Sequence, residues 1–218
     1  MKYNVKKMKK LLIWIVLVLG LIGATWGMAQ LASSPSGQPA TLASAVSDSD
    51  WVKGNRDAKV VLVEYSDLQC PACASYAPLV NMITEEFGDK IAFVYRHFPL
   101  PQHKQAELAA QAAEAAGKQG KFWEIMDLIF VNQTSWAEKS SAREAFVSYA
   151  QLLNLDIGRF ETDLDSPELK KKIKNDYASG AAVVTYTPTF FLNGVKIPNP
   201  RGYDEFRELI LQEINQNP

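Results

Sequence analysis

Residues 60–73 read Val-Val-Leu-Val-Glu-Tyr-Ser-Asp-Leu-Gln-Cys-Pro-Ala-Cys, and this stretch decides the fold of the chain. Its first six residues are almost continuously apolar, which is typical of a strand that is buried on both faces. A short polar turn follows, and the Cys-x-x-Cys motif then opens a segment with helical character. The stretch therefore predicts a buried strand that leads into a helix with two cysteines at its start.

Cys70 and Cys73 are the only cysteines in the chain, and they lie where an anion is stabilised. The unpaired N–H groups and the positive dipole end of a helix favour a thiolate at Cys70. Pro71 suits the first helical position, where its missing N–H costs nothing. Cys73 lies one turn further on and can close a disulfide with Cys70. The motif therefore predicts a redox-active Cys70–Cys73 pair with Cys70 as the nucleophile.

The cysteine pair has two other interpretations. Half of a zinc site would need two more ligands, and the only histidines, His97 and His103, lack a convincing spacing. An inert structural disulfide would close too short a loop to stabilise much. We therefore expect no metal site and no cofactor.

The start of the chain has a composition of its own. Five lysines within residues 1–10 precede the run Leu11–Ala29, whose 19 residues carry no charge. This pattern predicts a basic cytoplasmic start followed by a transmembrane anchor or a signal peptide. Trp14 and Trp26 near its ends favour an uncleaved anchor, while the small residues of Gly27–Ala29 leave cleavage open. Either way we expect an extracytoplasmic protein, anchored to the cytoplasmic membrane or secreted if cleaved, in a compartment where disulfides form.

The rest of the chain divides into a linker and a domain. Residues 30–49, rich in Ser, Ala and Pro, predict a flexible linker, and residues 50–217 predict one globular domain. After residue 30 the chain has 18 basic and 24 acidic residues, a net charge of −6. This balance argues against a nucleic-acid-binding protein.

Strand patterns lie at the two ends of the domain and helical patterns lie between them. Strands are predicted over residues 60–65, 90–96, 189–192 and 195–197, with Asn193-Gly194 as a strong hairpin signal between the last two. Apolar residues at helical spacing predict helices over residues 72–87, 105–116, 121–131, 141–153, 156–164, 166–178 and 203–214. Pro78 is expected to kink the first helix. The order predicts an α/β fold with a helical block in its middle.

This order, together with two motifs, resembles the DsbA-like family of thioredoxin-fold thiol–disulfide oxidoreductases, of the membrane-anchored bacterial type. The motifs are Val-Glu-Tyr-Ser-Asp-Leu-Gln-Cys-Pro-Ala-Cys at residues 63–73 and Thr-Tyr-Thr-Pro-Thr-Phe-Phe-Leu-Asn-Gly at residues 185–194. Residues 96–100 and 120–123 also look like segments of the family. The resemblance implies a thioredoxin fold with a helical insertion at about residues 104–180.

The resemblance also implies further site residues. Pro188 is expected to be cis and to face the two sulfur atoms, since proline is the residue for which a cis bond is accessible. Thr187 is expected to offer backbone groups to an extended substrate, with Pro71 and Ala72 beside it.

Glu64 is expected to be a buried carboxylate with a raised pKa that shuttles a proton for Cys73, and the family has an acidic residue at the matching place. The alternative is that Glu64 lies at a solvent-exposed end of the strand. Asp67 is expected to be a turn residue.

The implied function is that of a dithiol oxidase, which forms disulfides in unfolded or partly folded exported proteins with free thiols. A membrane partner of the DsbB or vitamin-K-epoxide-reductase (VKOR) kind would reoxidise it, by analogy only. Two alternatives remain: a reductase or isomerase with the same dithiol, and a non-catalytic tethered binding or chaperone module. Because Ala72 stands where strongly oxidising members have histidine, we expect a reduction potential between about −270 and about −120 mV.

Overall fold

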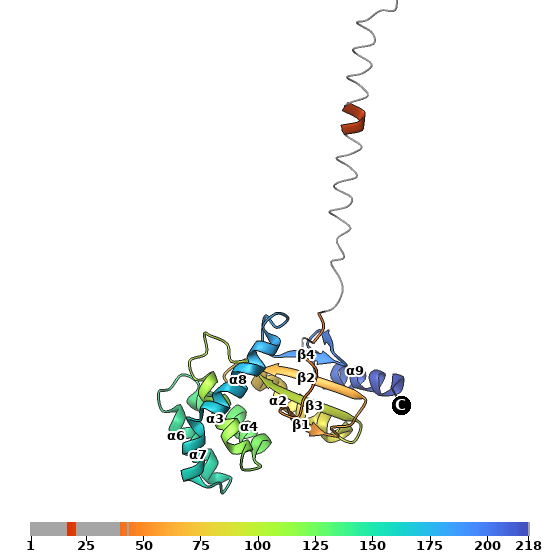
Figure 1. Ribbon diagram of the computed structural model, residues 1–218. Helices are drawn as coiled ribbons and strands as arrows, with labels where there is room; N and C mark the ends of the chain where they lie inside the picture. The colour runs from red at the N-terminus through yellow and green to blue at the C-terminus, as the bar shows by residue number, and fades with distance from the viewer. Residues whose placement is uncertain (1–16, 21–39, 43, 218) are drawn as a thin grey trace, which may run out of the picture. The chain divides into compact units, whose positions relative to one another are not determined.

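The computed structural model describes residues 17–20, 40–42 and 44–217 (Figure 1). The chain forms two units, residues 1–38 and residues 39–218, and only one helical turn of the first unit is described. Within the described part of the chain, no helix is long and apolar enough to cross a membrane. The predicted anchor over residues 11–29 lies almost wholly outside the described residues and remains a prediction.

The second unit is built on a five-stranded sheet with the strand order β1-β3-β2-β4-β5. Strands β2 and β3 are parallel, and the other neighbours are antiparallel. The bounds are β1 Trp51–Gly54, β2 Val60–Ser66, β3 Ile91–His97, β4 Thr189–Leu192 and β5 Val195–Ile197. Strand β2 is the middle strand, which explains why its sequence is apolar on both faces. The Asn193-Gly194 hairpin between β4 and β5 is confirmed, with both residues at positive φ as a tight turn requires.

Within the described part of the second unit, eight helices surround this sheet. Helices α2 and α9 pack against each other and against the strands, whereas α3 to α8 form one helical insertion between β3 and β4 (Figure 1). The bounds are α2 Pro71–Phe87, α3 Ala106–Gly117, α4 Phe122–Val131, α5 Gln133–Trp136, α6 Ala142–Leu152, α7 Ile157–Leu164, α8 Pro167–Gly180 and α9 Tyr203–Gln216. The predicted thioredoxin fold with a helical insertion is therefore confirmed.

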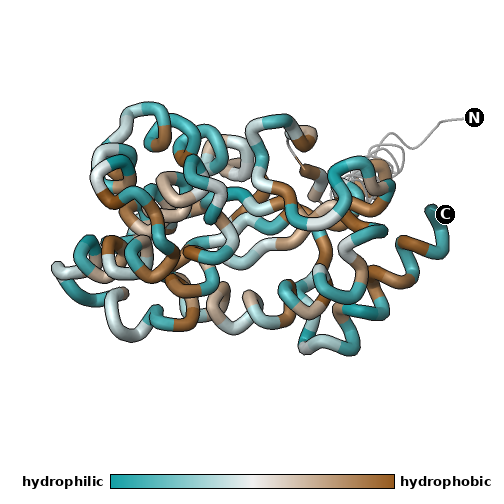
Figure 2. Tube along the Cα trace, turned by 90° about the horizontal axis from the view of Figure 1, so that it is seen from below, coloured by the Kyte–Doolittle hydropathy of each residue, from teal (hydrophilic) through white to brown (hydrophobic). Residues whose placement is uncertain are grey.

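Successive residues along the strands lie alternately in two separate hydrophobic cores, one on each face of the sheet. Leu62, Phe93 and Phe190 lie in the larger core with α2, α9 and the insertion. Val63 and Phe191, one residue along, lie in the smaller core on the other face of the sheet. Hydrophilic and hydrophobic positions alternate along most of the helices in Figure 2, as expected for helices with one face in a core. Both faces of the sheet are thus covered.

Arg96 on β3 binds the segment that precedes β1. Its guanidinium donates to both carboxylate oxygens of Asp50, at 2.8 and 3.0 Å. It also donates to the backbone oxygens of Ser44 and Ala45, at 3.1 and 2.9 Å, and to the hydroxyl of Tyr65 at 2.9 Å. These contacts, which we call the Arg96 clamp, hold residues 44–50 against strand β3.

The residues just before the clamp extend the sheet by one bridge. Thr41 pairs with Val195 of β5, and the backbone N–H of Leu42 donates to the carbonyl oxygen of Gly194 at 2.7 Å. The described part of the predicted linker at residues 30–49 is therefore held against the domain.

Candidate active site

The two cysteines lie where β2 passes into α2. Cys70 is the N-cap residue of α2, Pro71 follows as the first helical residue, and Cys73 completes the first turn. Both cysteines are free thiols, so the structure shows the dithiol form. Cys70 is 7% exposed and Cys73 is fully buried. The pair is thus asymmetric, with a reachable first sulfur and an enclosed second one.

The surroundings of the two sulfur atoms separate their pKa values. The pKa of Cys70 is lowered from 9.0 to about 5, mainly by the hydrogen bond from the Cys73 thiol and against the effect of burial. Thr187 and the backbone N–H groups of Cys73 and Ala72, at the start of the helix, contribute to the same lowering. Burial raises the pKa of Cys73 well above 9.0, and the neighbouring Cys70 and Glu64 add to this. Near neutral pH the site holds a Cys70 thiolate beside a Cys73 thiol.

We expect the reduced protein to titrate Cys70 with a midpoint near pH 5. Because its folded-state pKa is lowered, Cys70 contributes stability that is present above the unfolded pKa of 9.0 and lost as the pH falls through about 5. The measurement is the ultraviolet absorbance of the thiolate against pH, with Cys70→Ser as the control that lacks the transition. A midpoint near 9.0 would contradict the assignment.

The loop before β4 faces Cys70. The Thr187–Pro188 peptide bond is cis, as predicted. The Cys70 thiol lies 3.5 Å from the backbone oxygen of Thr187. Pro71 and Ala72 are exposed beside it at the start of α2. The structure therefore brings together these residues, which the sequence analysis expected around the substrate.

Glu64 lies in the middle of β2 and is only 4% exposed, so the alternative of a solvent-exposed strand end is wrong. Burial raises the pKa of its carboxyl group from 4.5 to about 7. Its charge in turn raises the pKa of Cys73. A carboxyl group with a pKa near neutrality beside a buried thiol is suited to proton transfer.

Glu64→Gln is expected to stabilise the fold at high pH. Because the folded-state pKa of Glu64 is raised, its contribution is fully present below pH 4.5 and is lost as the pH rises through about 7. The glutamine cannot ionise, so we expect the variant to exceed the wild type by about 3 kcal/mol at about pH 8 and to match it at about pH 4. Urea unfolding of the reduced proteins measures both values. An equal gain at both pH values would show that the ionisation of Glu64 is not the cause.

Asp67 and His103 form a part of the site that the sequence analysis did not assign. Asp67 accepts hydrogen bonds from the backbone N–H groups of Gln69, at 2.7 Å, and Leu100, at 2.8 Å. His103 Nδ1 lies 2.7 Å from the same carboxylate. The backbone N–H of Asp67 points at Cys73 Sγ over 3.4 Å. Asp67 is thus the turn residue that was expected, and it also orients an amide toward the buried sulfur.

Residues of the helical insertion form hydrogen bonds with the loop at residues 68–70, which ends at Cys70. Gln133 of α5 donates to the backbone oxygens of Leu68 and Cys70, at 2.8 and 3.1 Å. Gln69 donates to the backbone oxygen of Ala137 at 2.6 Å and accepts from the backbone N–H of Gln105 at 2.6 Å. These contacts hold the loop in one geometry. Only the fold reveals them, because they join residues far apart in sequence.

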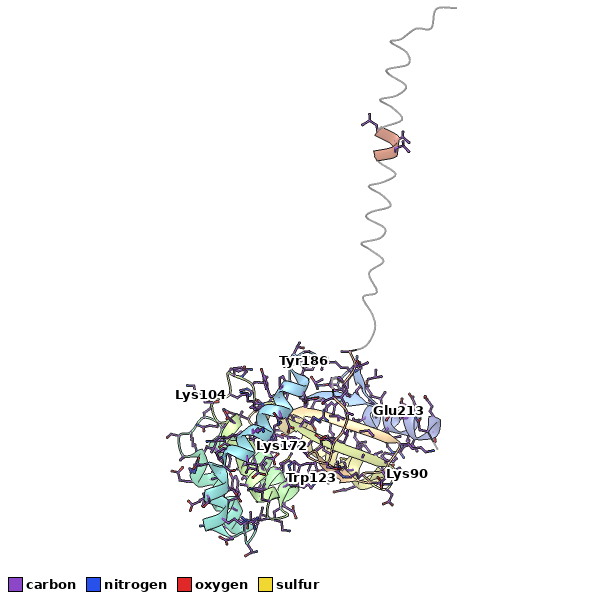
Figure 3. The ribbon with its side chains drawn as sticks, viewed as in Figure 1. Lys90, Lys104, Trp123, Lys172, Tyr186 and Glu213 are labelled. Carbon is purple, nitrogen blue, oxygen red and sulfur yellow. The ribbon has the colours of Figure 1, made fainter. Side chains whose placement is uncertain are left out.

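A second polar cluster is buried between β3, α3 and α8. His97, Glu114 and Asp176 each offer a ligand atom, all within 4.8 Å of one another. Lys172, labelled in Figure 3, already lies 2.6 Å from Asp176 and 3.8 Å from Glu114. Trp51 also donates to Glu114 at 3.0 Å. Because the ammonium group of Lys172 compensates the carboxylates, this cluster fits an internal ion-pair network.

Comparisons with known proteins agree with this geometry. A family model described as Thioredoxin matches residues 47–212. The chain is 39% identical over 149 residues to a protein named Na(+)/H(+) antiporter NhaA from Herminiimonas arsenicoxydans and 41% identical over 150 residues to another from Salinispora arenicola. These matches cover 68% and 67% of this chain but only 23% and 22% of the relatives. The chain therefore spans less than a quarter of those proteins, whose name describes the whole of them.

Solved structures share the fold. Bacillus subtilis BdbD, in its oxidised form, has a TM-score of 0.71 at 23% identity and covers 82% of this chain and 100% of its own. Wolbachia pipientis alpha-DsbA1 also has a TM-score of 0.71 at 23% identity and covers 79% of this chain and 94% of its own. The catalytic domain of Proteus mirabilis ScsC has a TM-score of 0.66 at 19% identity, covering 79% and 93%. These solved structures therefore show that the chain has the same fold as DsbA-type proteins, the thioredoxin fold with a helical insertion that the resemblance implied.

Proposed function

Because this chain belongs to the thioredoxin family, whose model matches residues 47–212, we propose that it is an exported protein disulfide oxidoreductase that works as a dithiol oxidase. The observation that carries the proposal is the asymmetry of the cysteine pair. Cys70 has a pKa of about 5 beside the Thr187–Pro188 loop, while Cys73 is buried with a raised pKa. Stabilising the Cys70 thiolate stabilises the reduced form, which makes the disulfide a better oxidant.

The reaction begins with the oxidised Cys70–Cys73 disulfide. A substrate thiolate attacks Cys70 Sγ, so the bond between the two cysteines breaks and a mixed disulfide forms on Cys70. Cys73 leaves with the electron pair and takes the proton held by Glu64, whose pKa of about 7 suits this transfer. Near neutral pH this step leaves Cys73 as a thiol and Glu64 as a carboxylate, which are the states that their surroundings favour.

A second substrate thiolate completes the cycle. It attacks the substrate sulfur of the mixed disulfide, forms the substrate disulfide, and releases Cys70 as a thiolate. The substrate loses two electrons, and the Cys70–Cys73 pair gains them. The low pKa of Cys70 makes it a good leaving group in this step.

Substrate binding follows from the groups around Cys70. The backbone of Thr187, whose oxygen lies 3.5 Å from the Cys70 sulfur, would pair with an extended chain, and the exposed Pro71 and Ala72 would contact it. Backbone pairing is independent of sequence, which suits unfolded exported proteins with free thiols as substrates. Reoxidation would come from a membrane DsbB- or VKOR-like enzyme, and the uncharged run at residues 11–29 would tether the chain near it.

The direction of electron flow is tested on the full chain. We expect a reduction potential clearly above thioredoxin's value of about −270 mV, and a catalytic gain of native disulfides when the oxidised protein is added to a reduced, unfolded test protein. A potential at or below about −270 mV, with reduction of the substrate disulfides instead, would assign the same dithiol to a reductase.

A further inference from the structure

Asp67 contacts both cysteines through its backbone. Its carbonyl oxygen accepts a hydrogen bond from the backbone N–H of Cys70 at 3.0 Å, and its own N–H points at Cys73 Sγ over 3.4 Å. Burial is the largest effect on the pKa of Cys73 and raises it, while the N–H of Asp67 acts in the opposite direction. This N–H is therefore placed to stabilise negative charge on a sulfur atom that is fully buried.

The side chain of Asp67 fixes the orientation of this N–H. The carboxylate is fully buried and accepts the backbone N–H groups of Gln69 at 2.7 Å and Leu100 at 2.8 Å. The first contact closes the turn that leads to Cys70, and the second joins this turn to the segment after β3. Because a buried carboxylate is costly without hydrogen bonds, these contacts stabilise one arrangement of the turn.

His103 adds a side-chain donor to the same carboxylate. Its Nδ1 lies 2.7 Å from Oδ2 of Asp67, the oxygen that also accepts the N–H of Leu100. A carboxylate only accepts hydrogen bonds, so Nδ1 carries the hydrogen atom in this pair. The backbone N–H of His103 donates to the carbonyl oxygen of Leu100 at 2.9 Å. The loop at residues 100–103 therefore holds Oδ2 of Asp67 with two donors at once.

Negative charge develops on Cys73 in both directions of thiol–disulfide exchange. When a substrate thiolate attacks Cys70 Sγ, the bond between the two cysteines breaks and its electron pair moves to Cys73 Sγ. In the reverse reaction the Cys73 thiolate attacks Cys70 Sγ, and the substrate leaves as a thiolate. Because Cys73 is fully buried, water does not solvate this charge. An N–H that already points at the sulfur stabilises both transition states without rearrangement.

We propose that His103 is a positioning residue for thiol–disulfide exchange, which acts through the Asp67 carboxylate to hold the N–H of Asp67 on Cys73 Sγ. The inference rests on the proposed function, since it names a residue that serves the same exchange. The effect concerns the rate in both directions, because one transition state is shared by the opening and the closing of the disulfide. The reduction potential therefore stays the same when His103 is replaced.

Three variants test the donor on His103. His103→Leu removes the hydrogen bond to Asp67 at a side chain that is 19% exposed, so no deeply buried group is lost. His103→Asn keeps an N–H donor at the position of Nδ1 and should restore the contact. Lys118→Met is the matched control, because Lys118 is 30% exposed and donates to the carboxylates of Asp163 and Glu168 beyond the other end of α3.

The experiment follows the full chain near neutral pH in both directions. Excess glutathione opens the disulfide of the oxidised protein, and Cys73 displaces glutathione from a mixed disulfide on Cys70 when the disulfide closes. Acid quenching and mass spectrometry measure both rates. We expect His103→Leu to slow both about tenfold with an unchanged reduction potential, and His103→Asn and Lys118→Met to match the wild type. The alkylation of Cys70 by iodoacetamide should be equally fast in all variants, since the N–H of Asp67 points at the other sulfur.

The outcomes separate this inference from the proposed function. Wild-type rates in His103→Leu, with a lower stability alone, would mean that His103 has a purely structural role and would overturn the inference. Slow exchange in His103→Asn as well would overturn it too, because the hydrogen-bond donor would not be the cause. So would an equal fall in the alkylation of Cys70, which would place the effect at the start of α2. A wild-type reduction potential too low for an oxidase would overturn the proposed function and leave the comparison of the variants intact.

Discussion

Replacing Cys70 by serine is expected to abolish thiol–disulfide exchange, with a loss of at least about a thousandfold. Serine has no thiolate at neutral pH and cannot form the mixed disulfide. Replacing Cys73 by serine is expected to have a different outcome, because Cys70 keeps its position at the start of α2 and still exchanges with external disulfides. Without Cys73 there is no internal thiol to release the bound partner, so mixed disulfides should accumulate.

Non-reducing gels and mass spectrometry of the full chain measure this difference. Cys73→Ser should carry a covalently bound thiol partner, and Cys70→Ser should carry none. Ala72→Ser is the matched control, since it introduces the same side chain between the cysteines and leaves both sulfur atoms in place. If Cys70→Ser retained its effect on the folding of exported proteins, the alternative of a non-catalytic binding or chaperone module would replace the oxidoreductase.

Arg96→Met is expected to lower the free energy of unfolding by about 3–5 kcal/mol, the usual cost of removing one partner of a buried ion pair. Asp50 would remain buried without its guanidinium. Burial opposes ionisation of Asp50, yet hydrogen bonds from Arg96 and Ser47 hold its pKa below 3.8. Because this folded-state pKa is lowered, the stability that Asp50 contributes is present above pH 3.8 and is lost as the pH falls below it. The variant should therefore approach the wild type in acid.

A double-mutant cycle measures this prediction. Urea unfolding of Arg96→Met, Asp50→Ala and the double variant should show that the double variant loses less than the sum of the two single losses. Arg207→Met is the control, since Arg207 and Glu86 form a more exposed ion pair whose loss is expected to change the free energy of unfolding far less. Additive losses would mean that Arg96 and Asp50 stabilise the fold independently.

The parts of the fold that carry strong local patterns could be predicted from the sequence. Strand β2 begins at Val60 as expected, because Val60–Val63 is a continuous apolar run in which three of the four residues are β-branched. Helix α2 begins at Pro71, since a proline suits the first helical position. The site residues Cys70, Cys73 and Glu64 lie within or beside these two elements, which is why the sequence placed them together.

Other parts depend on contacts that a local pattern does not contain. Strand β1 has four residues at the sheet edge, and helix α5 has four residues, so neither is long enough to show a period. No pattern in the sequence connects His103 with Asp67, which lies 36 positions earlier in the chain. The same holds for His97, whose buried partner Glu114 lies on another element. Such polar pairs form only after the insertion docks on the sheet.

The bridge between Thr41 and Val195 bears on the solubility of this domain. Strand β5 is the last strand of the sheet, and its outer backbone groups would be a template for pairing with a second molecule. Leu42 and Ala40 occupy that side with hydrogen bonds of 2.7 and 2.8 Å to Gly194 and Lys196. A fragment that begins at residue 50 would uncover this edge and should self-associate, whereas a fragment that begins near residue 40 should remain monomeric.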